Sequence, residues 1–128
     1  QAAMDMGIAY TKQRYAFGRP VASFQAIKHK FADMFVAQEL ARANAYYGAW
    51  ALSCDAPDLP LAAATARVSA SDAYYQITRV NIQVHGGMGF TWEFDCHLYY
   101  RRAQLLSGVI GTQPQWKEAV ASRLLNAA

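Results

Sequence analysis

A long stretch with helical periodicity most constrains the fold of this chain. From Phe24 to about Ser53, apolar side chains recur at three- and four-residue steps, while the charged residues fall largely between them. That spacing puts the apolar side chains on one face of an α-helix. Ser23 is the expected N-cap, and Pro57 and Pro60 mark the turn that follows. The stretch therefore predicts one long amphipathic helix.

A second long segment, residues 61–85, is rich in Ala, contains neither Gly nor Pro and stops at Gly86-Gly87. No window alternates polar and apolar residues well enough to demand a sheet, and short connections between long helices favour antiparallel packing. At 128 residues the chain is too short for two domains. We therefore expect an all-α antiparallel four-helix bundle over residues 1–128, with shorter helices at about 2–14, 93–106 and 114–125 and a link at 108–112.

The charge and hydropathy patterns exclude several classes of protein. Apolar stretches are broken by polar residues well before the roughly 20 residues of a membrane-spanning helix. The net charge of +3 is spread over scattered basic residues, apart from the pair Arg101-Arg102. Such a surface tolerates phosphate-bearing ligands but lacks the dense basic stripe of a nucleic-acid-binding protein. We expect neither membrane insertion nor nucleic-acid binding.

The cysteines and the N-terminal residues point to a cytoplasmic protein without a metal site. Cys54 and Cys96 lie far apart with no second Cys or suitably spaced His beside either, which argues against zinc and against a CxxC redox pair. Free thiols in a reducing cytosol fit this pattern. The segment from Gln1 to Met6 lacks the basic start and apolar run of a secretory signal.

Two motifs with unusual turns stand at the ends of the expected helices. The first is RYAFGRP at Arg14–Pro20, followed by Phe24-Gln25. A guanidinium at a helix end can grip a phosphate through several N–H donors, and the neighbouring Gly allows close approach. The second is QVHGGMGF, residues 83–90. Either motif alone is better explained as a helix-capping turn.

Taken together and in order, the motifs resemble the acyl-CoA dehydrogenase family. They are RxxFGxP, FQ, AD at 32–33, AR at 41–42, QxxGGxGF and GT at 111–112, and they cover essentially the whole chain. The resemblance implies a C-terminal helical domain whose N-terminal helical and middle β domains lie outside this chain. It also implies FAD as cofactor, an acyl-CoA substrate oxidised to its α,β-enoyl thioester, an electron-transfer partner, and a homo- or hetero-oligomer, typically a tetramer.

The resemblance also assigns cofactor contacts. Arg14 and Gln25 match family residues that contact FAD, and the residues around them would line the same groove. The QxxGG turn is similar to the segment that receives the adenosine part of an FAD held by a neighbouring subunit. The implied cofactor-binding residues are Arg14, Tyr15, Ala16, Phe17, Phe24, Gln25, Gln83, Val84, His85, Gly86, Gly87 and Thr112.

The catalytic base of the family is absent from its usual place. Many members have a Glu directly before the GT pair, and this position is Ile110 here, which cannot accept a proton. No Asp or Glu occurs from Ala103 to Pro114. The glutamates elsewhere have structural explanations, since Glu39 falls in the middle of a long helix, Glu93 looks like a first-turn acid and Glu118 lies early in the last helix. We therefore assign no catalytic residue within the chain.

Three explanations remain for the missing base. The Glu could come from a helix upstream, from a different subunit type, or from nowhere if the protein is catalytically silent. The stretch HGGMGFTWEFDCHLYYRR resembles the bacterial branch that acts on bulky steroid or aromatic acyl-CoAs, which favours a heteromeric assembly. Two other functions stay open beside the enzyme domain: a non-catalytic assembly subunit that completes a partner's FAD site, and a plain helical interaction module.

Overall fold

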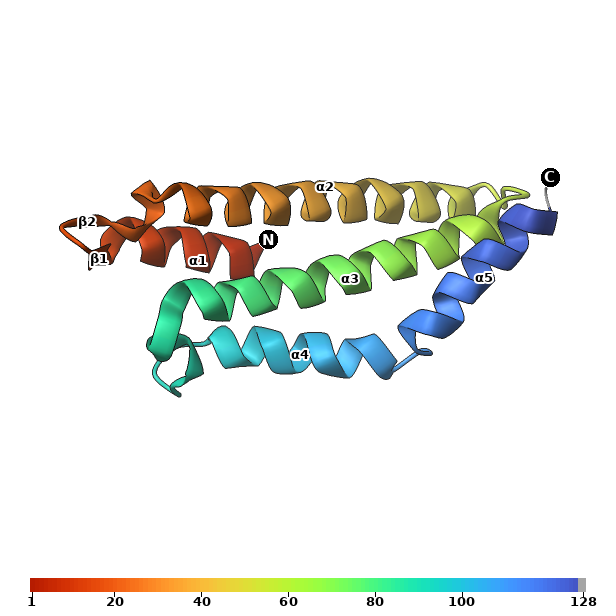
Figure 1. Cartoon of the computed structure of the whole chain (residues 1–128). Helices are drawn as coiled ribbons and strands as arrows, with labels where there is room; N and C mark the ends of the chain where they lie inside the picture. The colour runs from red at the N-terminus through yellow and green to blue at the C-terminus, as the bar shows by residue number, and fades with distance from the viewer. Residues whose placement is uncertain (127–128) are drawn as a thin grey trace.

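The computed structural model describes residues 1–126 and has an all-α architecture. Five α-helices account for most of this part of the chain, which confirms the predicted fold class. Two of them are long, and each spans nearly the length of the domain (Figure 1). The helices are α1 (Ala2–Gln13), α2 (Gln25–Ser53), α3 (Leu59–His85), α4 (Cys96–Gly108) and α5 (Gln113–Asn126).

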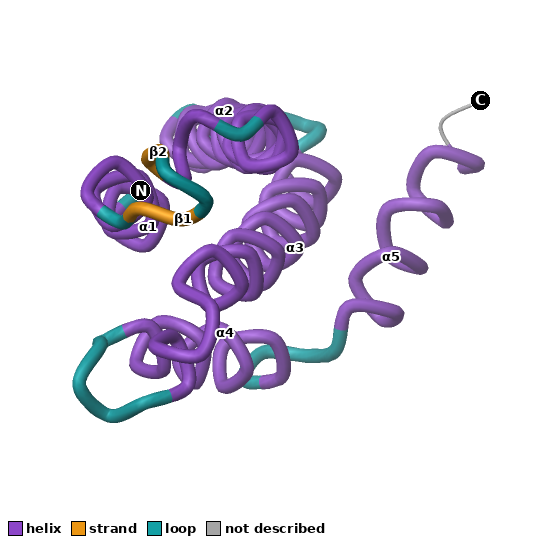
Figure 2. Tube along the Cα trace, turned by 60° about the vertical axis from the view of Figure 1, so that its left-hand side comes forward, coloured by secondary structure: helices purple, strands orange, loops and turns teal. Residues whose placement is uncertain are grey.

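Helix α3 is the centre of the bundle. It packs antiparallel against α2 over most of its length and also contacts α1, α4 and α5. Figure 2 shows α1 and α2 on one side of α3 and α4 and α5 on the other. Helix α2 lies close to α3 at Gly48, where an added Cβ would lie 3.4 Å from the Cβ of Ala66. The Ala content of α3 thus serves close helix packing.

The hydrophobic core lies where α1, α2 and α3 meet. Its fully enclosed members are Ala3, Met4, Met34, Ala73 and Ile77, and the side chain of Met34 has no exposed surface. Partly buried apolar residues, including Phe31 and Tyr99, pack around this cluster. Burial of these side chains holds α1 against the α2–α3 pair.

A short hairpin joins α1 to α2, although no alternating pattern in the sequence predicts a sheet. Strands β1 (Tyr15–Ala16) and β2 (Arg19–Pro20) pair antiparallel, with Tyr15 opposite Pro20. Phe17 and Gly18 form the turn with φ of 54° and 76°. Positive φ at both turn residues is the geometry of a two-residue hairpin. Strands of two residues are too short to produce an alternating pattern, so periodicity could not reveal them.

Three helix starts differ from the sequence prediction. Ser23 is not an N-cap, because it ends the 3₁₀ turn η1 (Val21–Ser23) and its hydroxyl donates to the carbonyl of Pro20 at 2.7 Å. Helix α3 begins at Leu59, with Pro60 accommodated in its first turn. Helix α4 begins only at Cys96, after the 3₁₀ helix η2 (Gly86–Phe90) and a loop. Glu93 therefore lies in that loop and not in a first helical turn.

Two features are absent from residues 1–126, the part of the chain that the structure describes. None of its helices is both long and apolar enough to cross a membrane. No three His, Cys, Asp or Glu side chains gather there in a way that could hold a metal ion.

Candidate functional site

A cavity of about 510 Å³ brings the two turn motifs together. It lies between the end of α1, the strand β1, the start of α2 and the end of α3. Residues separated by some seventy positions in the sequence thus share one wall. Eight of the predicted cofactor-binding residues line it, namely Arg14, Tyr15, Ala16, Gln83, Val84, His85, Gly86 and Gly87.

Arg14 reaches this cavity because α1 ends immediately before it. Its backbone is extended, with φ −78° and ψ 126°, while its N–H still donates to the carbonyl of Tyr10 at 2.8 Å. The Arg14 carbonyl accepts a hydrogen bond from the N–H of Val21 at 2.8 Å, which closes the base of the hairpin. The helix end and the hairpin therefore fix the backbone from which the exposed guanidinium extends.

The segment that carries Arg14 is strongly basic. Between Asp5 and Asp33 there are five Lys or Arg residues and no acidic residue. Positive charge concentrated in this way favours an anion, and a guanidinium offers the fork of N–H donors that phosphate oxygens accept. Of these five residues only Arg14 lines the cavity, and its guanidinium suits a phosphate group.

The glycine turn after α3 also lines the cavity. Gly86 has φ 61° and ψ −139°, a conformation that only glycine adopts readily. A Cβ added at Gly86 or Gly87 would meet no atom within 4 Å, so the backbone here borders open space. Gly89, by contrast, is buried, and a Cβ there would lie 2.5 Å from the carbonyl oxygen of Ile82. The first two glycines shape the cavity, and the third packs the turn against α3.

His85 lies below this turn as a buried polar group. Its ring stacks on Tyr10 with centroids 4.1 Å apart and meets Phe94 edge-on at 5.5 Å. Nδ1 is 2.8 Å from the carbonyl oxygen of Asn81, and Nε2 has no hydrogen-bond partner. Since a carbonyl can only accept, Nδ1 carries the proton and Nε2 is a free acceptor. One nitrogen of the His85 ring is therefore buried without a hydrogen-bond partner.

Lys30 adds a contact that the sequence did not reveal. Its Nζ donates to Oε1 of Gln83 at 3.0 Å, which links α2 to α3 at the edge of the cavity. The cluster Lys28-His29-Lys30 reads as a solvated face from sequence alone. Tyr10, Val21, Ile27 and Met88 also line the cavity without having been predicted. Only Tyr10 had a usable signal, because it precedes Arg14 by one helical turn.

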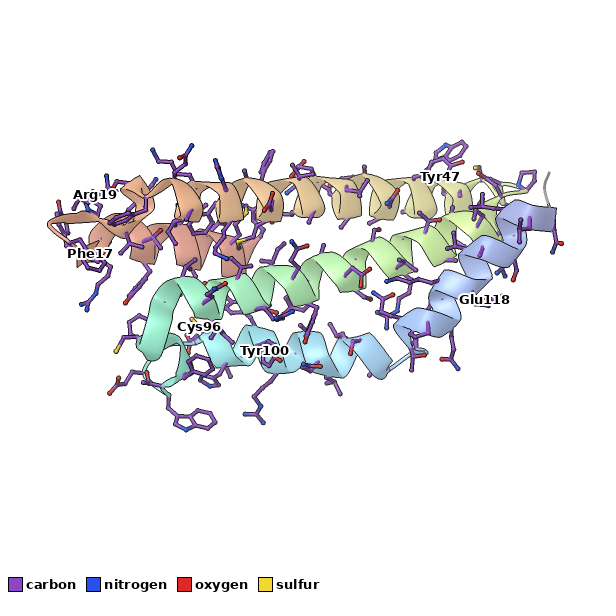
Figure 3. All side chains as sticks on the ribbon, viewed as in Figure 1. Phe17, Arg19, Tyr47, Cys96, Tyr100 and Glu118 are labelled. Atoms are coloured by element: carbon purple, nitrogen blue, oxygen red, sulfur yellow. The ribbon has the colours of Figure 1, made fainter. Side chains whose placement is uncertain are left out.

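Four predicted residues lie outside the cavity lining. Phe17 lies at the hairpin tip (Figure 3), and 96% of this residue is exposed. Phe24 instead packs beneath the guanidinium of Arg19, 3.9 Å from its ring centroid. Gln25 is exposed at the start of α2. Thr112 lies in the loop between α4 and α5, far along the bundle from the hairpin (Figure 1).

The loop with Ile110 and Thr112 is well anchored but contains no proton acceptor. Trp116 donates its indole N–H to the Ile110 carbonyl at 2.8 Å. Oε1 of Gln115 accepts from the backbone N–H and the hydroxyl of Thr112 at 2.8 and 3.0 Å. The Ile110 side chain is 60% exposed. An exposed hydrocarbon side chain thus occupies the position where the resemblance to the family implies a carboxylate.

This combination defines a class of protein. A helical bundle in which an arginine at a helix end and a glycine turn border an open cavity can hold the phosphate-bearing part of a nucleotide cofactor. The family model described as acyl-CoA dehydrogenase, C-terminal domain, matches residues 1–125. The chain belongs to the acyl-CoA dehydrogenase family.

Individual relatives agree with this assignment. The chain is 46% identical over 100 residues to acyl-CoA dehydrogenase IpdE2 of Mycobacterium tuberculosis, covering 78% of this chain and 30% of that protein. It is 37% identical over 125 residues to the probable acyl-CoA dehydrogenase YngJ of Bacillus subtilis, covering 98% and 33%. The chain therefore spans about a third of the length of these relatives.

Solved structures share the fold over nearly the whole chain. Butyryl-CoA dehydrogenase from Megasphaera elsdenii is 32% identical, with a TM-score of 0.91 over 97% of this chain and 32% of that one. A chain described as a steroid ACAD is 26% identical, with a TM-score of 0.92 over 98% and 34%. The helical arrangement of this chain is thus that of known acyl-CoA dehydrogenases.

Proposed function

We propose that the protein containing this domain is a cytoplasmic, FAD-dependent acyl-CoA dehydrogenase, which oxidises an acyl-CoA thioester to its α,β-enoyl thioester. The single observation that carries the proposal is the cavity shared by the RxxFGxP and QxxGG motifs. Within it, the domain contributes contacts to the adenosine and phosphate part of an FAD held by a neighbouring subunit. The isolated domain would therefore be inactive.

The residues at the cavity fit such a ligand. Arg14 supplies positive charge and N–H donors for phosphate, and Gly86 and Gly87 leave room for close approach to the backbone. FAD, when bound, supplies the acceptor for the hydride that leaves the substrate β-carbon.

The cofactor contacts of Phe17, Phe24, Gln25 and Thr112 belong to the same proposal. The first three lie on or beside the hairpin, adjacent to the cavity, so a ligand larger than the cavity would extend over them. Thr112 would contact a separate part of the cofactor. Its hydroxyl donates to Gln115, which leaves its oxygen lone pairs available as acceptors.

The proton that leaves the α-carbon needs a base from outside this chain. Ile110 cannot accept it, and residues 103–114 contain no acid. We propose that a carboxylate of a different subunit type serves this role, within a heteromeric tetramer that passes electrons to a separate electron-transfer protein. Similarity to a steroid ACAD supports a bulky acyl group as substrate.

A test of the cofactor proposal removes one charge from the cavity. The intact protein, with its partner subunit, should purify with bound flavin that bleaches when acyl-CoA is added without oxygen. Arg14→Ala removes a charge-assisted contact worth about 1.5–3 kcal/mol, so flavin should bind about 10- to 150-fold more weakly. Arg123→Ala on α5 removes the same charge away from the cavity and should leave flavin binding unchanged. A flavin-free wild-type complex would refute the proposal.

A non-catalytic assembly subunit is the second candidate, and the exposed hydrocarbon side chain at Ile110 favours it. In that case, Arg14→Ala and Gln25→Ala should still release flavin from the complex. Replacing Glu39, Glu93 and Glu118 by Gln should leave turnover intact. The two candidates differ in whether acyl-CoA binds in contact with this chain. The enzyme proposal expects a photoreactive acyl-CoA to cross-link to it. A subunit that only completes the partner's FAD site should show no such cross-link.

A further inference from the structure

Two of the segments that line the cavity belong to separate helices, and packing must fix their relative position. Arg14 follows α1, and the turn that begins at Gly86 follows α3. Both lie at the same end of the bundle (Figure 1). A ligand that contacts both segments binds tightly only if they are held at the right separation before it arrives. A residue that holds them can therefore change affinity without touching the ligand.

Three aromatic rings from three parts of the chain meet at this end of the bundle. Tyr10 belongs to α1, His85 to α3, and Phe94 to the loop between η2 and α4. The rings of Tyr10 and His85 stack with centroids 4.1 Å apart and an interplanar angle of 22°. Phe94 makes an edge-on contact with each of them, at centroid distances of 5.6 Å from Tyr10 and 5.5 Å from His85. We call these three residues the three-ring cluster.

Tyr10 connects the cluster to Arg14. The Tyr10 carbonyl accepts a hydrogen bond from the N–H of Arg14 at 2.8 Å, so the ring and the Arg14 backbone are one helical turn apart. Three residues before Tyr10, α1 comes close to α3 at Gly7, where an added Cβ would lie 3.0 Å from Oδ1 of Asn81. The contact at Gly7 and the ring stack are thus two points that fix the end of α1 against α3.

His85 connects the cluster to the glycine turn. It is the last residue of α3, and Gly86 follows it directly. Its Nδ1–H donates to the carbonyl of Asn81 at 2.8 Å, which holds the ring against the helix end. A Cβ added at Gly89 would lie 3.1 Å from the Cβ of His85, so the turn folds back closely onto this residue. A shift of the His85 ring would therefore move the turn.

Phe94 is the member of the cluster that does not line the cavity, whereas Tyr10 and His85 do. It is half-buried, and its carbonyl accepts a hydrogen bond from Nδ1 of His97 at 2.9 Å, which attaches the loop to the first turn of α4. The loop thus presents the Phe94 ring to the other two rings from a fixed backbone. Phe94 can act on a ligand in this cavity through Tyr10 and His85.

We propose that Phe94 is a positioning residue for the cofactor. It holds the stack of Tyr10 on His85 and so sets the separation between Arg14 and the glycine turn. The inference rests on the proposed function, in which this cavity receives the adenosine and phosphate part of FAD. Without the Phe94 ring the stack can open, and only a fraction of the molecules then has the cavity in its binding arrangement. The apparent dissociation constant rises in inverse proportion to that fraction.

A leucine variant tests the effect on affinity. Phe94→Leu removes the ring and keeps most of the apolar volume. In the intact protein with its partner subunit, flavin fluorescence titration should show a dissociation constant about 3- to 10-fold higher, the change expected for losing an aromatic contact of about 0.7–1.4 kcal/mol. Phe94→Tyr keeps the ring and should restore the affinity of the wild type.

The matched control is Tyr100→Leu. Tyr100 of α4 also contacts a ring of α3, that of Tyr75, with centroids 6.0 Å apart, and Tyr75 lies ten residues before His85. Neither tyrosine lines the cavity. Urea unfolding should show that both leucine variants lower the free energy of unfolding. Only Phe94→Leu should weaken flavin binding, because only Phe94 belongs to the three-ring cluster.

Amide hydrogen exchange in flavin-free protein tests the positioning itself. The N–H groups of Arg14 and Gly86 donate to the carbonyls of Tyr10 and Gln83, and neither amide belongs to the loop that carries Phe94. Phe94→Leu should speed the exchange of both amides about 3- to 10-fold, because the ends of α1 and α3 then open more often. Tyr100→Leu should leave both exchange rates unchanged.

Three results would overturn the inference: wild-type flavin affinity in Phe94→Leu, unchanged exchange at Arg14 and Gly86, or the same loss of affinity in Tyr100→Leu. A Phe94→Tyr variant that binds flavin as weakly as Phe94→Leu would also overturn it, since the ring would then not be what positions the cavity. A wild-type complex without flavin refutes the proposed function instead. In that case the exchange rates still decide whether Phe94 holds the two segments together.

Discussion

Two glycines in the same turn should respond in opposite ways to the addition of one methyl group. Gly89 is buried, and its added Cβ would lie 2.5 Å from the backbone carbonyl oxygen of Ile82 and 3.1 Å from the Cβ of His85. Neither neighbour is the flexible end of a side chain, so the turn itself must move. Overpacking of this kind costs about 1–3 kcal/mol. Gly89→Ala should lower the free energy of unfolding by that amount.

The matched variant is Gly87→Ala, where the new methyl group meets nothing within 4 Å. Its backbone φ is not in the left-handed region, so the substitution should leave the free energy of unfolding within about 1 kcal/mol of wild type. The methyl group would instead enter the cavity and weaken flavin binding. Urea unfolding of the intact protein, followed by far-ultraviolet circular dichroism, measures the first effect, and flavin fluorescence titration the second. Equal stability of Gly89→Ala and wild type would refute the packing argument.

Three further experiments test the surroundings of Met34, Cys96 and Tyr47. Met34→Ala should destabilise the fold by about 2–5 kcal/mol in urea unfolding, because the deleted side chain is fully enclosed. Burial raises the pKa of the Cys96 thiol, so thiol reagents should label Cys96 only as fast as the domain unfolds; rapid labelling in native buffer would contradict this. The hydrogen bond to Asp58 raises the pKa of Tyr47 above 10.0 and so favours the protonated phenol in the folded state. The contribution of this hydrogen bond to stability should be complete below about pH 10 and lost as the pH rises through the pKa of Tyr47 in the folded protein. A pH series of melting temperatures should show this loss for the wild type and not for Tyr47→Phe.

The fold was predictable because the long helices satisfy several local rules at once. The segments that became α2 and α3 have helical periodicity, turn residues at their ends and few breakers, and both helices exist close to the predicted bounds. The hairpin and the late start of α4 were not predictable. Both depend on backbone conformations of a few residues, such as the positive φ of Phe17, that leave no periodic signal.

The candidate site was predictable in part for a different reason. Arg14 and Gly86 lie in recognisable motifs, and the motifs share a cavity because α1 and α3 end at the same side of the bundle. Tyr10, Ile27 and the bond of Lys30 to Gln83 arise from how the helices pack against each other. No local sequence pattern encodes that packing, so residue types alone could not predict that these residues lie at the cavity. The cofactor roles themselves stay predictions.

The central position of α3 determines the order in which parts of this domain unfold. Helices α4 and α5 rest mainly on α3, and α5 contains no fully buried residue. Their loss would keep the contacts among α1, α2 and α3 and would remove only Tyr99 of α4 from the residues packed around the core cluster. Cooperative units of this kind open separately, each with its own free energy. The hydrogen-exchange protection of the amides should therefore fall in steps from the centre outward. The loop with Ile110 and Thr112 belongs to the outermost unit, and the cavity with Arg14 and Gly86 to the innermost.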